Sequence, residues 1–177
     1  MKISTALPKL TRYLLEEITR CKDAGATISS VTMIYVCIDT MAFLSMPMGQ
    51  TTQGKRDFIV WVDTYLKTAQ SHTYQYRGLD VYAARCSLLH AFSAEARIHK
   101  EDVSVPVFGY LDNGPHAFDP SVSPRVVLIS VEMLIQDLAR AIMGFFAAME
   151  TDADLRALVE SRLPSLYEEL PFGVDAP

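Results

Sequence analysis

The chain has 177 residues, of which 50% are apolar and 21% charged, and its formal net charge is −5. This composition excludes intrinsic disorder, which requires low hydrophobicity and high net charge. The modest numbers of glycine, proline and cysteine exclude collagen-like chains and disulfide scaffolds. A chain of this length is expected to form one domain with its own core, which we place at residues 1–170, followed by a loose C-terminal tail over 171–177.

Apolar spacing predicts four helices in the first hundred residues. The second begins at Thr27 or Ser29 and is apolar on nearly all sides, which indicates a helix buried at the centre of the fold. A loop rich in proline and glycine separates it from the third helix, which contains Trp61. The four helices are expected over about 8–20, 27–46, 58–66 and 79–94.

After Glu101 the sequence becomes rich in β-branched and aromatic residues. Two such runs flank turn-forming residues, which predicts two short strands paired as a hairpin within an insertion over about 103–130. A helix that begins at Ser123 is the alternative, because Pro124 would occupy its favoured first position. Two further helices are expected, from Ser130 onward and over 152–162. The predicted fold is therefore a mainly α bundle of about five to six helices with a small β-hairpin insertion.

The apolar stretch near the start of the chain is too short and too polar for a secretory signal peptide. Three cysteines, an odd number without metal-type spacing, fit a reducing compartment. The most apolar window, 31–48, contains Asp39 and Pro47 and falls short of a membrane span. We therefore expect a cytoplasmic protein with no membrane association.

The acidity of the chain is confined to its C-terminal part. Residues 1–100 carry a net charge of +4 and residues 101–177 carry −9. The overall negative charge is thus no objection to a nucleic-acid partner of the first hundred residues, although +4 is too small to predict phosphate binding.

The sequence contains no Gly-rich phosphate loop, no HExxH, no CxxC pair and no GxSxG motif. One pair of chemically useful residues remains on the fourth predicted helix. Arg85 and His90 are separated by four residues in the sequence RCSLLH.

An Arg and a His separated by four to six residues, in the last core helix of a small helical domain, resemble the motif of the HEPN (higher eukaryotes and prokaryotes nucleotide-binding) superfamily. The resemblance covers about residues 9–95 as a bundle, together with this one short motif. It implies a HEPN-like fold and a metal-independent endoribonuclease that uses no cofactor and no metal. It also implies a homodimer in which two copies of the motif face each other across a cleft, RNA as the substrate, and an antitoxin or other protein partner.

Under this resemblance His90 is the general acid or base and Arg85 stabilises the transition state. Metal-free RNA cleavage needs a group that exchanges protons near neutral pH and a permanent positive charge for the phosphate oxygens. On an ideal helix, side chains five residues apart point about 140° away from each other. A site built from two chains, or an irregularity in the helix near Arg85, would remove this difficulty.

Three further residues are expected to support this pair. Asp39, in apolar surroundings on the second helix, would orient Arg85; the alternative is a carboxylate that reaches the helix edge or bonds nearby hydroxyl groups. Cys86 and Ser87 follow Arg85 directly, although many active members carry Asn, Asp or His at the position of Cys86. Phe92 stands where some HEPN toxins carry a tyrosine that is modified, so adenylylation at that position is not expected.

The connection before the fourth helix contributes candidates for substrate binding. Tyr74 and Tyr76 are placed to stack on bases and Arg77 to contact phosphate. The alternative is that these aromatic residues simply pack on the bundle.

Two other functions remain open. One is a non-catalytic helical interaction domain in which Arg85 forms an interior salt bridge. The other is a small-molecule-binding domain that uses a pocket between the fourth helix and the β insertion. An accessible His90 within a few ångströms of Arg85 would favour the nuclease, whereas a His90 buried among leucines would exclude it.

Overall fold

The computed structural model describes residues 5–166, except for the side chain of Ala91. The tail predicted over 171–177 lies outside these residues. The described chain is mainly helical, which confirms the predicted class, and it carries one small two-stranded sheet. Its helices are α1 (Ala6–Asp23), α2 (Thr27–Leu44), α3 (Lys55–Trp61), α4 (Gly78–Cys86), α5 (Arg97–Glu101), α6 (Val131–Thr151) and α7 (Ala153–Arg162); its strands are β1 (Val107–Leu111) and β2 (Val126–Ser130).

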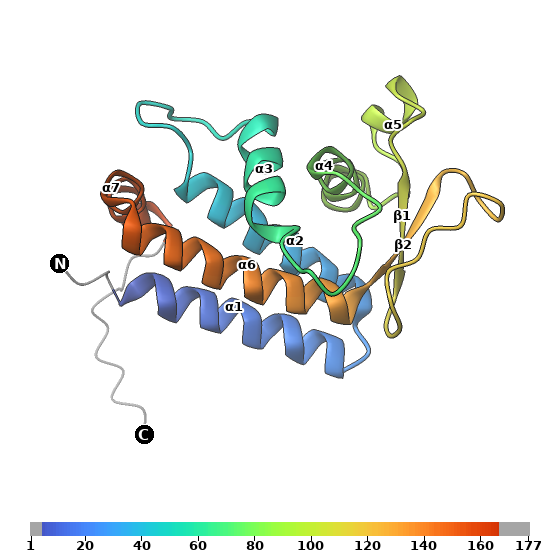
Figure 1. Ribbon diagram of the computed structural model, residues 1–177, viewed down its shortest axis with the longest axis horizontal. Coiled ribbons are helices and arrows are strands. Elements are labelled where there is room, and N and C mark those ends of the chain that lie inside the picture. The colour runs from blue at the N-terminus through green and yellow to red at the C-terminus, as the bar shows by residue number, and fades with distance from the viewer. Residues whose placement is uncertain (1–4, 167–177) are drawn as a thin grey trace.

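The core lies where α1 and α6 pack against α2. In Figure 1, α1 and α6 run side by side, and α3 and α4 lie on the other side of α2. Trp61, Phe145 and Tyr35 are among the largest fully buried side chains. The Trp61 and Phe145 rings join α3 to α6 through an edge contact, with their centroids 6.3 Å apart.

Helix α2 is apolar around most of its circumference, and half of its residues are buried inside the fold. By length and composition it is the one helix among the described residues that could cross a membrane. Its burial agrees with the prediction of a central core helix. The polar Ser30 is accommodated there because its hydroxyl donates to the carbonyl of Ile18 at 3.1 Å.

The two strands are parallel, so the predicted hairpin is wrong. Val107 lies opposite Val126, and the register continues from there to the pair Leu111 and Ser130. The intervening residues return along the far side of β2, where Ala117 forms two backbone hydrogen bonds with Leu128. The turn residues after β1 therefore start a crossover rather than a hairpin, which is the longer connection that parallel strands require.

The alternative helix that begins at Ser123 is also wrong, because 126–130 forms β2. Helix α6 begins immediately afterwards, at Val131. Ser130 is the reason for the change, since its hydroxyl accepts a hydrogen bond from the backbone N–H of Met133 and caps the new helix.

Helices α3 and α4 each continue as a short π-helical segment, over Val62–Leu66 and Ser87–Ala91. With these continuations the third and fourth helices lie close to the ranges predicted from apolar spacing. Helix α5, a single short helix between the fourth helix and β1, was not predicted. Its five residues are too few for a periodic pattern to be visible.

The end of α7 holds the end of α2. The Arg162 guanidinium donates to backbone carbonyls of Leu44 at 3.2 Å and Pro47 at 2.8 Å, and also to those of Phe43 and Met46. The last carbonyls of a helix have no partner within it, and a cation there also interacts favourably with the helix dipole. One side chain thus satisfies the exposed end of the central helix.

We therefore predict that Arg162→Ala lowers the free energy of unfolding by about 2–3 kcal/mol, because it leaves several partly buried carbonyls without a charged donor. Arg162→Lys should recover only part of this loss, since an ammonium group cannot span the same set of carbonyls. Urea unfolding followed by circular dichroism measures both. Arg20→Ala, which removes an exposed arginine paired with Glu17, is the control and should change stability by less than about 1 kcal/mol. Equal effects at Arg162 and Arg20 would contradict the prediction.

Candidate functional site

Helix α4 carries the predicted motif, and its start is fixed closely against α3. The Gly78 N–H donates to Asp63 at 2.9 Å, and a side chain at Gly78 would meet the carbonyl of Ile59 at 2.7 Å. Asp80 accepts from the Arg77 N–H at 2.8 Å and so caps the helix. The close packing at this end determines the direction in which α4 delivers Arg85.

The π segment Ser87–Ala91 resolves the angular difficulty of the motif. Its hydrogen bonds join residues five apart rather than four, so side chains five apart come to the same face. The segment ends at Phe92, which adopts a left-handed backbone with φ 46° and ψ 44°. Such a conformation is strained for a non-glycine residue and is concentrated at functional sites. A helix irregularity near Arg85, one of the two arrangements that would remove the difficulty, is therefore present.

Arg85 stands between Asp39 and His90. Its Nε and Nη2 atoms each lie 2.8 Å from Oδ2 of Asp39, and its Nη1 lies 2.7 Å from Nε2 of His90. Asp39 lies on α2. Its other oxygen, Oδ1, accepts a hydrogen bond from Nε2 of Gln53, in the loop after α2, at 3.5 Å. The three residues that the sequence singled out as general acid or base, charge stabiliser and orienting carboxylate thus form one chain of contacts. We call this chain the Asp39–Arg85–His90 site.

The site is open at one end and shielded at the other. The side chains of Arg85 and Asp39 are 19% and 23% exposed, whereas His90 is exposed to solvent. Burial raises the pKa of Asp39, and the hydrogen bonds and charge of Arg85 offset part of that rise. Burial acts to lower the pKa of Arg85, but the neighbouring Asp39 outweighs it and the pKa is raised overall. Arg85 is consequently a fixed positive charge beside an accessible imidazole.

The hydrogen bond between Arg85 and His90 fixes the state of the imidazole. A guanidinium has only donors, so Nε2 of His90 accepts and carries no proton in this arrangement. A neutral His90 therefore bears its proton on Nδ1. While this hydrogen bond is formed, the lone pair on Nε2 cannot accept a proton from a substrate. It becomes available when another acceptor binds the Arg85 N–H.

The two residues after Arg85 lie differently. Ser87 is buried and its hydroxyl donates to the carbonyl of Ala83 at 3.0 Å, so it does not face Arg85 and His90. The Cys86 thiol is partly exposed and interacts with both Arg85 and Tyr82. Of the two predicted supporting residues, Cys86 contacts the site and Ser87 packs inside the helix turn.

The structure places Tyr74, Tyr76 and Arg77 together, but apart from His90. All three line a cavity of about 340 Å³ between the connection before α4 and the β region. Arg77 precedes α4 and Arg85 is in its last turn, so they are about 12 Å apart along the helix. Tyr76 is only 4% exposed, which leaves its ring no open face for a base. Tyr76 therefore packs on the bundle, as in the alternative for these aromatic residues.

A second polar cluster, which the sequence did not reveal, joins His72, His116 and Asp137. Asp137 Oδ2 lies 3.4 Å from His72 Nε2 and 3.6 Å from His116 Nε2. These atoms are close enough to hold a metal ion. However, His116 Nδ1 accepts the backbone N–H of Ser130 at 3.1 Å, so the neutral ring carries its proton on Nε2 and has no lone pair there for a metal. Within the described part of the chain the three converging atoms form no hydrogen bond, so the cluster is better described as a buried carboxylate packed against two imidazole rings.

Asp137 is stabilised as an anion in that cluster. Burial alone would raise its pKa, but the neighbouring His116, Arg140 and Tyr74 side chains lower it overall. Arg140, on the same helix, donates to Asp137 Oδ1 at 2.6 Å, whereas His116 and Tyr74 belong to two loops that meet α6 at this point. The residues are far apart in sequence and show no spacing from which the cluster was predictable.

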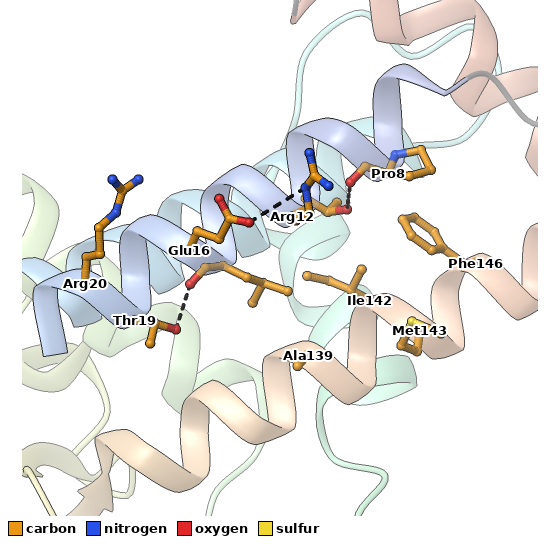
Figure 2. A pocket seen from close by; sticks show the side chains of 11 residues that line it. Pro8, Arg12, Glu16, Thr19, Arg20, Ala139, Ile142, Met143 and Phe146 are labelled. Atoms are coloured by element: carbon orange, nitrogen blue, oxygen red, sulfur yellow. Dashed lines mark hydrogen bonds and ion pairs between the residues drawn. The ribbon is translucent and has the colours of Figure 1, made fainter. Parts of the chain in front are cut away.

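Two further hollows have linings that do not include Asp39, Arg85 or His90. A groove of about 770 Å³ runs between α1 and α6, and in Figure 2 Ile142 and Phe146 of α6 point toward α1 across it, while Met143 lies beside them at its edge. Arg12 and Glu16 form an ion pair on its α1 side, 3.7 Å between Nε and Oε1. A smaller cavity of about 250 Å³ lies between the fourth helix and β1, where the sequence placed a small-molecule site.

Comparison of the chain with protein-family models, with curated proteins and with solved structures finds no match. The geometry of the site therefore carries the functional conclusion.

The raised pKa of Asp39 implies that the stability of the fold depends on pH. The folded protein binds a proton at this carboxyl more readily than the unfolded chain, so the stability it contributes falls as the pH rises from about 3.9, the ordinary value, through the raised pKa. Asp39→Asn removes this dependence. The difference in unfolding free energy, wild type minus variant, should decrease with pH over that interval and then stay constant. Urea unfolding at a series of pH values measures it.

Asp119→Asn is the matched control, with the opposite sign. Hydrogen bonds from Ser121 lower the pKa of this exposed carboxyl, so its contribution is present above the ordinary pKa and is lost as the pH falls. The corresponding difference should therefore increase with pH. An increase for Asp39 as well would show that attraction to Arg85 outweighs the burial of the carboxylate.

Proposed function

We propose that the chain is a HEPN-like, metal-independent endoribonuclease that acts at the Asp39–Arg85–His90 site. The observation that supports this most strongly is the 2.7 Å contact between Arg85 Nη1 and an exposed His90 Nε2, five residues apart and brought together by the π segment. The buried-histidine outcome that would have excluded a nuclease does not occur.

In the proposed reaction Arg85 binds the phosphate first, and His90 then transfers a proton. A phosphate that enters the site takes the Arg85 N–H as a hydrogen-bond donor and frees the lone pair on His90 Nε2. His90 then removes the proton from the ribose 2′-hydroxyl while that oxygen forms a bond to phosphorus. The bond from phosphorus to the 5′ oxygen breaks, and this oxygen receives a proton. The products are a 2′,3′-cyclic phosphate and a 5′-hydroxyl.

Arg85 supplies charge where charge develops. Its planar, permanently charged group is suited to the non-bridging oxygens of the phosphorane. Asp39 binds Nε and Nη2 of Arg85, so Nη1 is the nitrogen directed toward His90 and the substrate. Asp39 is thus a positioning residue that acts through Arg85.

The remaining parts of the proposal follow from the resemblance. A homodimer would bring a second His90 to the site, which provides one histidine to take the first proton and another to deliver the second. The proposed setting is cytoplasmic, with RNA as substrate and an antitoxin as a protein partner.

The test is incubation of purified protein with mixed single-stranded RNA in the presence of EDTA. We expect cleavage that leaves 2′,3′-cyclic phosphate ends. His90→Ala should slow it by about 10²–10⁴-fold because a proton-transfer group is lost. Arg85→Ala should slow it by about 10²–10³-fold because a charge-stabilising donor is lost.

Arg12→Ala is the matched control, because it removes an exposed arginine, likewise paired with a carboxylate, from α1 outside the site. It should retain the rate of the unmodified protein. Cleavage that survives in both site variants would identify a contaminating nuclease, and a stable, folded protein with no cleavage at all would overturn the proposal.

A non-catalytic interaction domain is the second candidate, and the α1–α6 groove is the observation that favours it. Its apolar lining and its exposed Met143, at 66%, are typical of surfaces that bind a partner. In that function Arg85 serves only as an ion pair between α2 and α4, so Arg85→Ala lowers stability and changes no activity.

A further inference from the structure

A groove next to the Asp39–Arg85–His90 site offers a second place for RNA. It has a volume of about 230 Å³ and is bordered by α3, α4 and α5. Its lining consists of Lys55, Tyr82, Cys86, Ala96, Arg97, Ile98 and Glu101. We call it the Lys55 groove.

The groove adjoins the site on α4. Cys86, which lines the groove, directly follows Arg85 in the helix. Tyr82, which also lines the groove, lies three residues before Arg85, so their side chains are neighbours on the helix surface. A strand with one phosphate at Arg85 can therefore extend into this groove.

The two walls of the groove carry cations from separate elements. Lys55 begins α3, and its ammonium lies 5.9 Å from the centre of the Tyr82 ring. Among the described residues, no carboxylate forms an ion pair with Lys55. A cation in the first turn of a helix opposes the helix dipole, and Arg56 adds a second one there. Helix stability therefore does not account for the charge at this position.

Arg97 stands on the wall formed by α5. Its Nε lies 3.1 Å from Oε1 of Glu101, with the two side chains 88% and 59% exposed. An ion pair so exposed to water contributes little to stability, so Arg97 can leave Glu101 and bind a phosphate instead. Glu101 is at the same time a local repulsive charge for any phosphate.

We propose that the Lys55 groove binds the phosphodiester that neighbours the scissile one, with Lys55 and Arg97 as its cationic contacts. This inference rests on the proposed function, because it assumes a single-stranded RNA at Arg85. A positively charged groove that follows the backbone, with aromatic side chains in its lining, is the usual means of holding a single strand without reading its sequence.

The experiment separates binding from cleavage. Each variant is made in the His90→Ala background, and its affinity for a fluorescently labelled single-stranded RNA of about 12 nucleotides is measured by fluorescence anisotropy at several salt concentrations. Lys55→Ala and Arg97→Ala should each weaken binding by about 3–10-fold at low salt. Each should also reduce the slope of log affinity against log salt by about 0.7, the value for one phosphate contact on a single strand.

Glu101→Gln should have the opposite effect. It removes the repulsive carboxylate and releases Arg97, so binding should tighten by about 2–3-fold at low salt. Arg12→Ala removes an arginine that is likewise paired with a glutamate, but on α1, and should leave both affinity and slope unchanged. The control distinguishes a site from a general effect of net charge.

The outcomes of the two proposals differ. Equal effects of Lys55→Ala and Arg12→Ala would overturn the groove while leaving cleavage at Arg85 and His90 to its own test. Binding that depends on Lys55, in a protein whose unmodified form does not cleave, would support the groove and overturn the nuclease. A protein that binds no RNA at any salt concentration would overturn both.

Discussion

The ion pair between Asp39 and Arg85 is the interaction on which the site depends. Half of the residues of helix α2 are buried, and a carboxylate on such a helix is unfavourable unless a charged donor satisfies it. Arg85 does so with two nitrogens bound to one oxygen. Since the guanidinium is planar, this attachment also determines where its third nitrogen points. The requirement to compensate a charge near the core thus directs a donor toward His90 and the solvent.

The backbone of the fourth helix completes the arrangement. A regular α-helix would carry His90 well away from Arg85, whereas the π segment places it 2.7 Å from Nη1. The left-handed Phe92 that ends the segment is strained, and strain persists only where the surrounding structure holds it. Close packing at Gly78 holds the opposite end of α4. The helix is therefore fixed at its start by sterics and at its end by the contacts of Asp39 with Arg85.

Apolar periodicity was sufficient to predict the long helices, including the burial of α2, because burial depends on which side chains line each face. It also placed Arg85 and His90 on one helix, whereas Asp39 was suggested as the partner of Arg85 by its apolar surroundings and by the HEPN resemblance. The parallel pairing of β1 and β2 was not predictable, since it depends on a crossover whose turn residues resemble those of a hairpin. The His72–His116–Asp137 cluster was missed for a related reason, because only the folded chain brings those loops to α6.

The acidic residues of the last part of the sequence are spread over several elements. Glu101 and Asp102 lie at the end of α5, whereas α7, which lies in Figure 1 at the end of the molecule away from α4 and α5, carries two acidic and two basic residues. Salt screens charges over about 8 Å at physiological ionic strength, so exposed carboxylates beyond that distance have little effect at the Lys55 groove. The field that an RNA backbone meets there is set by the nearest charged groups, Lys55, Arg97 and Glu101 of the lining and the adjacent Asp102, which interacts with the charge of Lys55. A negative net charge is therefore compatible with a local phosphate site, and the salt dependence of binding reports those few side chains rather than the whole protein.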